Sequence, residues 1–171
     1  SIETLKEAFQ SEGYVLSEEG EVSPFVLDNL PEKEMTRALL AYARRARKGV
    51  LDAALLVGTG KDLLEAVAKH VLLVKSIPVD TKGNFPFLLG QAFISLDMMT
   101  PEHKPKPGEP AIMRYERALF ELGCSVNSIR NHEGTGHGRP FLPTISEDEA
   151  ENAAQSIGII ADYMLRKLIS K

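Results

Sequence analysis

The ten residues from Arg130 to Arg139 combine a titratable base, fixed positive charge and a flexible backbone in one segment. They read Arg-Asn-His-Glu-Gly-Thr-Gly-His-Gly-Arg, with two histidines, two arginines, one amide and three glycines. Histidine has an unperturbed pKa of about 6.5, so it accepts or donates a proton near neutral pH. Arginine stays charged and matches a pair of phosphate oxygens with two parallel hydrogen bonds. Together these groups suit the cleavage of an RNA phosphodiester.

The expected catalytic residues are Arg130, His137 and Asn131. His137 would take the proton from the 2′-OH or protonate the leaving 5′-oxygen, and Arg130 would stabilise the extra negative charge of the phosphorane. Asn131 would orient the histidine or bind phosphate. One chain supplies one such histidine, whereas in-line cyclisation profits from a base and an acid. A two-fold dimer with both motifs at its seam would supply two.

The other residues of the motif are expected to bind substrate or shape the loop. Glycines permit backbone turns that bring His137 back toward the helix end, and we assign this role to Gly134, Gly136 and Gly138. The expected substrate-binding residues are Arg139, His132 and Thr135. Arg139 equally suits an exposed surface position, and His132 a solvent-facing one.

Purely structural roles compete with these catalytic and substrate-binding assignments. Arg130 can cap carbonyls at a helix end while His137 bonds to backbone. A zinc site from His103, His132 and His137 lacks cysteine support and ligand spacing, so we expect no metal and no cofactor. The stretch 58–61 lacks the spacing of a phosphate-binding loop. Structural roles are favoured for the remaining charged candidates: His70 in packing, Glu65 in a salt bridge, and the basic run 44–48 as a solvated helix end rather than an RNA-binding stripe.

Proline and glycine breaks divide the chain into expected helices. These cover residues 1–10, 32–48, 50–77 (kinked or split at Gly58 and Gly60), 84–99, 111–130 and 146–169. Residues 11–31 are expected to be irregular, and the proline-rich segment 100–110 to be a mobile, exposed loop. Ser146 and Glu149 form a capping-box signature. With no convincing strand alternation and no internal repeat, the prediction is an all-α, compact bundle of about five or six helices.

An apolar stripe marks the expected helix that precedes the motif. Its members recur every three or four residues: Ile112, Tyr115, Leu119, Leu122, Val126 and Ile129. Such a heptad-like stripe suits a helix–helix interface. Because it adjoins Arg130, we expect it to form part of the dimer seam.

The length, net charge and cysteine content of the chain limit the class of protein to which it can belong. A chain of 171 residues is most readily one domain, and a net charge of −4 argues against wholesale electrostatic capture of nucleic acid. Cys124 is the only cysteine, so no intrachain disulfide can form. The chain has no apolar run long enough for a membrane span and no signal-peptide pattern at its start. We therefore expect a cytoplasmic protein with no membrane association.

The segment from Ser125 to Arg139 resembles the C-terminal domain of bacterial abortive-infection proteins. That domain has an Arg-Asn pair, a short glycine-containing loop, a His-Gly-Lys/Arg triplet and an alanine-rich helix, which Asn152-Ala153-Ala154 fits. The arginine at 130, six intervening residues and the histidine at 137 are similar to the motif of the HEPN superfamily. Gly136 departs from the small residue, such as alanine, often found there. The resemblance covers about 111–168, with weaker similarity over 51–73 and none over 1–48.

This resemblance implies a compact, usually dimeric HEPN-like bundle with metal-independent ribonuclease activity in phage defence or toxin–antitoxin systems. The implied partners are RNA, a second copy of the chain and an antitoxin or other regulatory protein. We expect one domain over 1–171, with N-terminal helices of unclear role in 1–48 and the HEPN-like bundle in 49–171. The alternative, which the modest charge favours, is a non-catalytic helical module that dimerises or senses RNA or a nucleotide.

Overall fold

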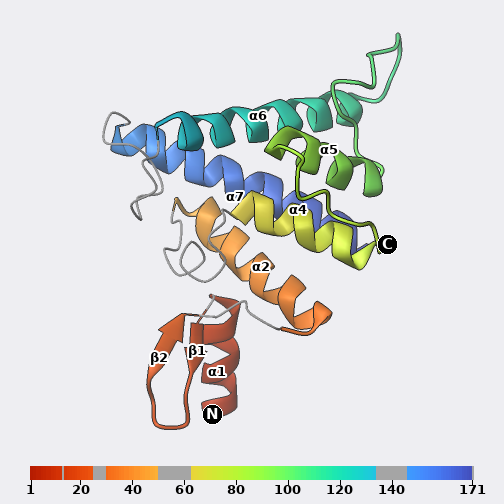
Figure 1. Cartoon of the computed structure of the whole chain (residues 1–171). Coiled ribbons are helices and arrows are strands. Elements are labelled where there is room, and N and C mark those ends of the chain that lie inside the picture. Colours follow the sequence, from red (N-terminus) through yellow and green to blue (C-terminus); the bar gives the residue numbers. More distant parts are fainter. Residues whose placement is uncertain (13, 25–29, 50–62, 134–145, 171) are drawn as a thin grey trace.

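The computed structural model describes residues 1–12, 14–24, 30–49, 63–133 and 146–170. Within these ranges the chain forms six helices and one small hairpin (Figure 1): α1 (Ile2–Ser11), β1 (Tyr14–Leu16), β2 (Val22–Pro24), α2 (Glu32–Arg47), α4 (Leu63–Val74), α5 (Phe85–Ser95), α6 (Ala111–Glu133) and α7 (Glu147–Ile169). The predicted all-α bundle is confirmed. No helix in the described part of the chain is both long enough and apolar enough to span a bilayer.

The beginnings of α5 and α7 follow local signals in the sequence. The side chain of Ser146 accepts a hydrogen bond from the backbone N–H of Glu149 at 3.1 Å, and the Glu149 carboxylate accepts one from the Ser146 N–H at 3.0 Å. This is the predicted capping box, which satisfies two otherwise unpaired N–H groups. Asn84 caps α5 by accepting from the Phe87 N–H at 3.0 Å.

Two helices end earlier than predicted because a non-glycine residue turns the backbone. Ser76 and Asp97 have φ angles of 56° and 57°, in the left-handed region. In each case the backbone N–H of the following residue donates a hydrogen bond to the carbonyl five residues earlier: Ile77 to Leu72 at 2.8 Å, and Met98 to Phe93 at 2.9 Å. This bond closes a helix end. It terminates α4 at Val74 and α5 at Ser95, short of the predicted ends at residues 77 and 99.

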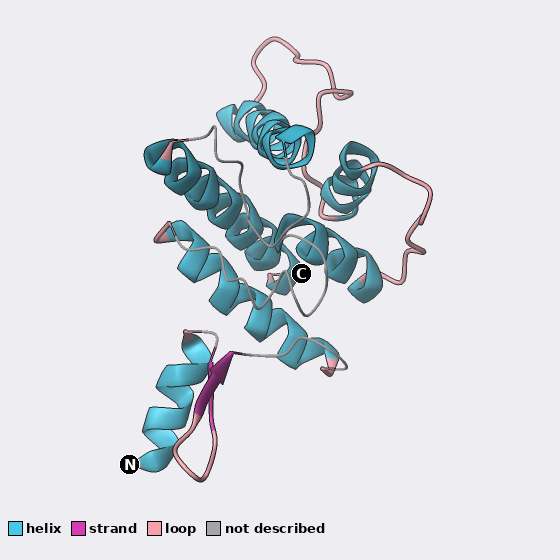
Figure 2. Cartoon of the chain, turned by 60° about the vertical axis from the view of Figure 1, so that its left-hand side comes forward, coloured by secondary structure: helices cyan, strands magenta, loops and turns pink. Residues whose placement is uncertain are grey.

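The prediction that residues 11–31 are irregular is wrong for part of that segment. Strand β1 pairs antiparallel with β2, with Val15 opposite Ser23, and Gly20 turns between them with φ 84°. Strands of three residues are too short to show alternation in sequence. Figure 2 shows the hairpin beside α1, at one end of the helical bundle.

Helix α7 lies at the centre of the bundle and packs against α2, α4 and α6, while α5 packs against α4 and α6 (Figure 1). Its central residues Ile160, Met164 and Leu165 are fully buried. On the α5–α6 side, Phe93 and Phe120 meet edge to face, with ring centroids 5.5 Å apart. Burial of this apolar surface is the main force that holds the helices in place.

The stripe on α6 divides into a buried and an exposed part. Leu119 and Val126 are each 4% exposed and belong to the core. The other four members retain large exposed fractions: Ile112 48%, Tyr115 45%, Leu122 38% and Ile129 40%. Three of the four, Tyr115, Leu122 and Ile129, follow one another at seven-residue spacing along one edge of α6. The stripe therefore serves the core on one edge and presents an apolar surface on the other.

Candidate functional site

The motif begins in the last turn of α6, which ends at Glu133. Arg130, Asn131 and His132 are therefore helical, and the prediction that His132 belongs to the following loop is wrong. Asn131, His132 and Glu133 carry no helix-breaking feature, and the first glycine follows them. The remaining site residues, Gly134, Thr135, Gly136, His137, Gly138 and Arg139, lie outside the described residues.

Helices α6 and α7 run antiparallel, which fixes the surroundings of the motif. Tyr115, near the start of α6, meets Tyr163, near the end of α7, with ring centroids 5.8 Å apart. Farther along, a β-carbon on Gly123 would lie 3.5 Å from the Cδ1 of Ile160. The C-terminal end of α6 consequently lies beside the N-terminal end of α7, as Figure 1 shows. Arg130 therefore stands at the end of the bundle where α7 begins.

The start of α7 brings negative charge to this end of the bundle. Glu147, Asp148 and Glu149 occupy its first turn and are exposed. They complement the partial positive charge of the helix N-terminus, which would otherwise attract an anion. Glu151 follows and packs against Gly49 at the end of α2, where a β-carbon on Gly49 would meet its Cγ at 2.6 Å. The first turn of α7 therefore offers an RNA phosphate no positive charge from its own side chains.

His70 is a packing histidine, as predicted. Its side chain is 4% exposed, and its Nε2 lies 2.6 Å from the hydroxyl of Thr36, so it joins α4 to α2. The Thr36 hydroxyl also lies within bonding distance, 3.1 Å, of the Glu32 carbonyl. Burial lowers the pKa of His70, and the negative charge of Glu32 opposes this in part. A buried neutral imidazole that links two helices supports the fold rather than a reaction.

His103 belongs to a loop that is fixed at its base. Its Nδ1 accepts a hydrogen bond from the backbone N–H of Thr100 at 3.1 Å, and its carbonyl accepts one from Arg117 at 3.2 Å. Arg117 also pairs with Glu109 at the other end of the loop. The segment 100–110 is therefore held at both ends, although its lysines, Lys104 and Lys106, are exposed as predicted.

The geometry separates His103 from the motif. Arg117, which contacts His103, stands fifteen residues before His132 on α6, and this spacing corresponds to about 22 Å along the helix. His103 and His132 are thus too far apart to share a metal ion. Within the described ranges, no three His, Cys, Asp or Glu side chains are grouped so as to hold a metal.

The basic end of α2 is used to attach other parts of the chain. Arg44 donates to the Ser11 carbonyl at 2.7 Å, Arg45 lies over the Tyr14 ring at 4.8 Å, and Lys48 pairs with Glu12 at 3.4 Å. These contacts hold α1 and the hairpin against α2. Arg44, Arg45 and Lys48 therefore have structural roles in place of the RNA-binding stripe considered as their alternative, whereas Arg47 faces α7 and pairs with Asp162 at 3.3 Å.

Glu65 also has a structural role, as favoured. It pairs with Lys69 one turn later on α4, with 3.0 Å between carboxylate and ammonium. The glycine-rich stretch 58–61 lies outside the described residues.

Comparison with known proteins assigns the family. The model of the Abi_C family, described as a HEPN-like domain, matches residues 32–168. Searches among curated proteins and among solved structures found no match. The matched range includes α2, which lies before the segments whose resemblance was visible in the sequence, and it includes the whole of the motif. Because it spans most of the chain, the protein belongs to the Abi_C family of HEPN-like domains.

Proposed function

We propose that this chain is a metal-independent endoribonuclease domain of a phage-defence protein. One observation carries the proposal: the Arg130-to-His137 motif begins at the C-terminal end of α6, directly before α7, within the range that matches a HEPN-like domain. The setting would be the cytoplasm, where an antitoxin or other regulatory protein restrains the activity.

The proposed reaction is an in-line transfer at phosphorus. His137 removes the proton from the 2′-OH, the 2′-oxygen bonds to phosphorus, and the bond from phosphorus to the 5′-oxygen breaks. The products are a 2′,3′-cyclic phosphate and a 5′-OH end, the latter protonated by an imidazolium. Arg130 stabilises the negative charge that develops on the phosphorane oxygens, and Asn131, the next residue of α6, orients the histidine or binds phosphate. Arg139, His132 and Thr135 bind the flanking RNA.

A second copy of the chain would supply the second histidine. The half of the α6 stripe nearest the motif carries Leu122 and Ile129, which are 38% and 40% exposed. In a two-fold dimer the same apolar residues of both copies lie in the interface and become buried. We place the dimer seam there, so that the two motifs share one cleft.

The test is RNA cleavage in the presence of EDTA by the parent protein and single variants. We expect His137→Ala to lower the cleavage rate by about 100-fold or more, the contribution typical of a general acid or base. Arg130→Ala should lower it by a similar factor. Arg37→Ala, which removes an exposed arginine on α2, is the matched control and should leave the rate unchanged. Equal rates in the parent and in His137→Ala would overturn the proposal.

A non-catalytic module is the second candidate, favoured by the net charge of −4 and by the acidic first turn of α7. Such a module would use the same bundle to dimerise or to sense RNA or a nucleotide. It predicts intact RNA after long incubation together with a stable dimer in light scattering. Cleavage that depends on His137 excludes it.

A further inference from the structure

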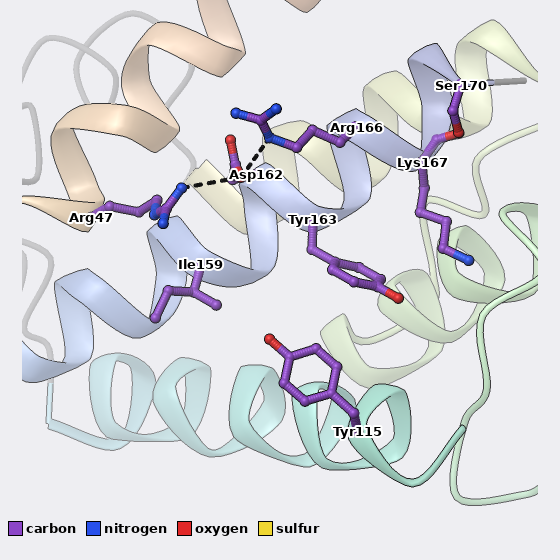
Figure 3. Close-up of a pocket in the computed structure, with 8 residues that line it drawn as sticks. All are labelled: Arg47, Tyr115, Ile159, Asp162, Tyr163, Arg166, Lys167 and Ser170. Carbon is purple, nitrogen blue, oxygen red and sulfur yellow. Dashed lines mark hydrogen bonds and ion pairs between the residues drawn. The ribbon is translucent and has the colours of Figure 1, made fainter. Parts of the chain in front are cut away.

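A groove lies on the outer face of α7, toward the end of the bundle opposite the motif. Its floor is a single face of the helix, with residues at helical spacing: Ile159, Asp162, Tyr163, Arg166, Lys167 and Ser170. Arg47 of α2 borders one side and Tyr115 of α6 the other (Figure 3). The groove has a volume of about 460 Å³. Three helices that are distant in the sequence thus build one concave surface.

The groove carries an excess of positive charge. Arg47 and Arg166 share one carboxylate oxygen of Asp162, with Nη1 at 3.3 Å and Nε at 2.9 Å. The side chains of the two arginines are 51% and 69% exposed. Figure 3 shows the terminal nitrogens of Arg166 turned away from Asp162. Since Lys167 adds a third cation, the one carboxylate in the lining leaves most of the positive charge available to an anion.

Aromatic rings stand beside these cations. Tyr115 is 45% exposed, and its ring is tilted by 59° to that of Tyr163. The Lys167 ammonium lies 5.8 Å from the centre of the Tyr163 ring. Burial and the nearby Glu116 raise the pKa of Tyr163, so its phenol stays neutral and can donate a hydrogen bond to a phosphate oxygen. Because Tyr115 is nearly half exposed, it is accessible to a base from solvent.

We propose that this groove binds single-stranded RNA, with backbone phosphates on Arg47, Arg166 and Lys167 and a base stacked on Tyr115. Proteins bind single strands by combining cations that lie along the phosphate backbone with aromatic rings on which the bases stack. A mononucleotide fits less well, because small-ligand pockets bury most of their ligand and these side chains are widely exposed. The choice of RNA rests on the proposed ribonuclease function.

The groove is a separate site and not an extension of the catalytic motif. Tyr115 precedes Arg130 by fifteen residues on α6, or about 22 Å of helix. RNA held in the groove would be anchored away from the bond that is cut. The groove should therefore raise affinity for long RNA, and so lower KM, without changing kcat.

The test uses fluorescence anisotropy of a labelled oligouridylate with the His137→Ala protein, which binds without cutting. The groove variant adds Arg47→Gln and Arg166→Gln. The matched control adds Lys33→Gln and Arg37→Gln, which remove the same charge from an exposed face of α2. We expect Kd to rise about tenfold in the groove variant only, and the salt slope to fall by about 1.4, as expected for the loss of two contacts to single-strand phosphates.

A second variant guards against misfolding caused by the unpaired Asp162. Tyr115→Leu keeps an apolar surface side chain and all charges, and should weaken binding about fivefold, as expected for a lost stacking partner. Equal affinities in the groove variant, Tyr115→Leu and the control would overturn the proposal. So would the loss of dimer in light scattering with RNA affinity unchanged, which would make the groove a protein interface. Cleavage assays with His137 intact report separately on the ribonuclease, so either proposal can fail while the other stands.

Discussion

The backbone nitrogen of Arg47 lies where Gly158 has no side chain: a β-carbon on Gly158 would be only 2.4 Å away. The same β-carbon would lie 2.7 Å from the carbonyl oxygen of Ala43. Helices α2 and α7 therefore cross with their backbones almost in contact. This crossing brings Arg47 to Asp162, one turn farther along α7, and so builds one wall of the groove.

Gly158→Ala should destabilise the fold, because the obstructing atoms are backbone and cannot rotate away. Overpacking of this kind costs about 1–3 kcal/mol. The free energy of unfolding in urea measures it. Gly90→Ala is the matched control on α5, where a β-carbon would meet only Phe120 at 3.7 Å. That change should stabilise the protein by about 0.5–1 kcal/mol, as alanine does in a helix interior. A neutral Gly158→Ala would show that the two helices are free to separate.

Stability should decrease in mild acid because of His70. Burial lowers the pKa of His70 in the folded chain from its ordinary value of 6.5. The unfolded chain therefore binds more protons as the pH falls, and the stability present above about pH 6.5 is lost progressively below it. His70→Gln keeps a donor for Thr36 but does not titrate, so its unfolding free energy should vary less between about pH 8 and pH 5. If the unfolding free energy depended on pH in the same way in both proteins, the loss of stability in acid would come from groups other than His70.

Cys124 should be a poor nucleophile in the folded protein. Burial and the nearby Glu121 raise the pKa of its thiol to about 11, and the reactive species is the thiolate. Near pH 8, alkylation by iodoacetamide should therefore be at least about 100-fold slower in the folded chain than in urea. Mass spectrometry of timed samples gives both rates. Similar rates would mean that the α6–α7 side of the bundle opens readily.

The parts of the fold that local chemistry determines could be predicted from the sequence. The capping box at Ser146 and the breaks at proline and glycine located most helices. The ends at Ser76 and Asp97 could not be predicted, because neither is the glycine that usually adopts a left-handed φ. The hairpin was missed because its strands are too short for a periodic signal.

The motif could be predicted from the sequence, whereas the groove could not. Arg130 and His137 are seven positions apart, so their pairing is a local pattern that can be seen in the sequence. The groove joins Arg47, Tyr115 and one face of α7, and only the crossing at Gly158 brings the first of these to the last. No spacing in the sequence carries that information, since it depends on how three helices pack.

The central claim is that His137 and Arg130 act on one RNA phosphate without a metal. Its most direct test is the chemistry of the new RNA ends after incubation in EDTA, read by mass spectrometry. We predict 2′,3′-cyclic phosphate and 5′-OH ends from the parent protein, and uncut RNA from His137→Ala. Ends with 3′-OH groups, or the same cyclic ends from both proteins, would contradict the account.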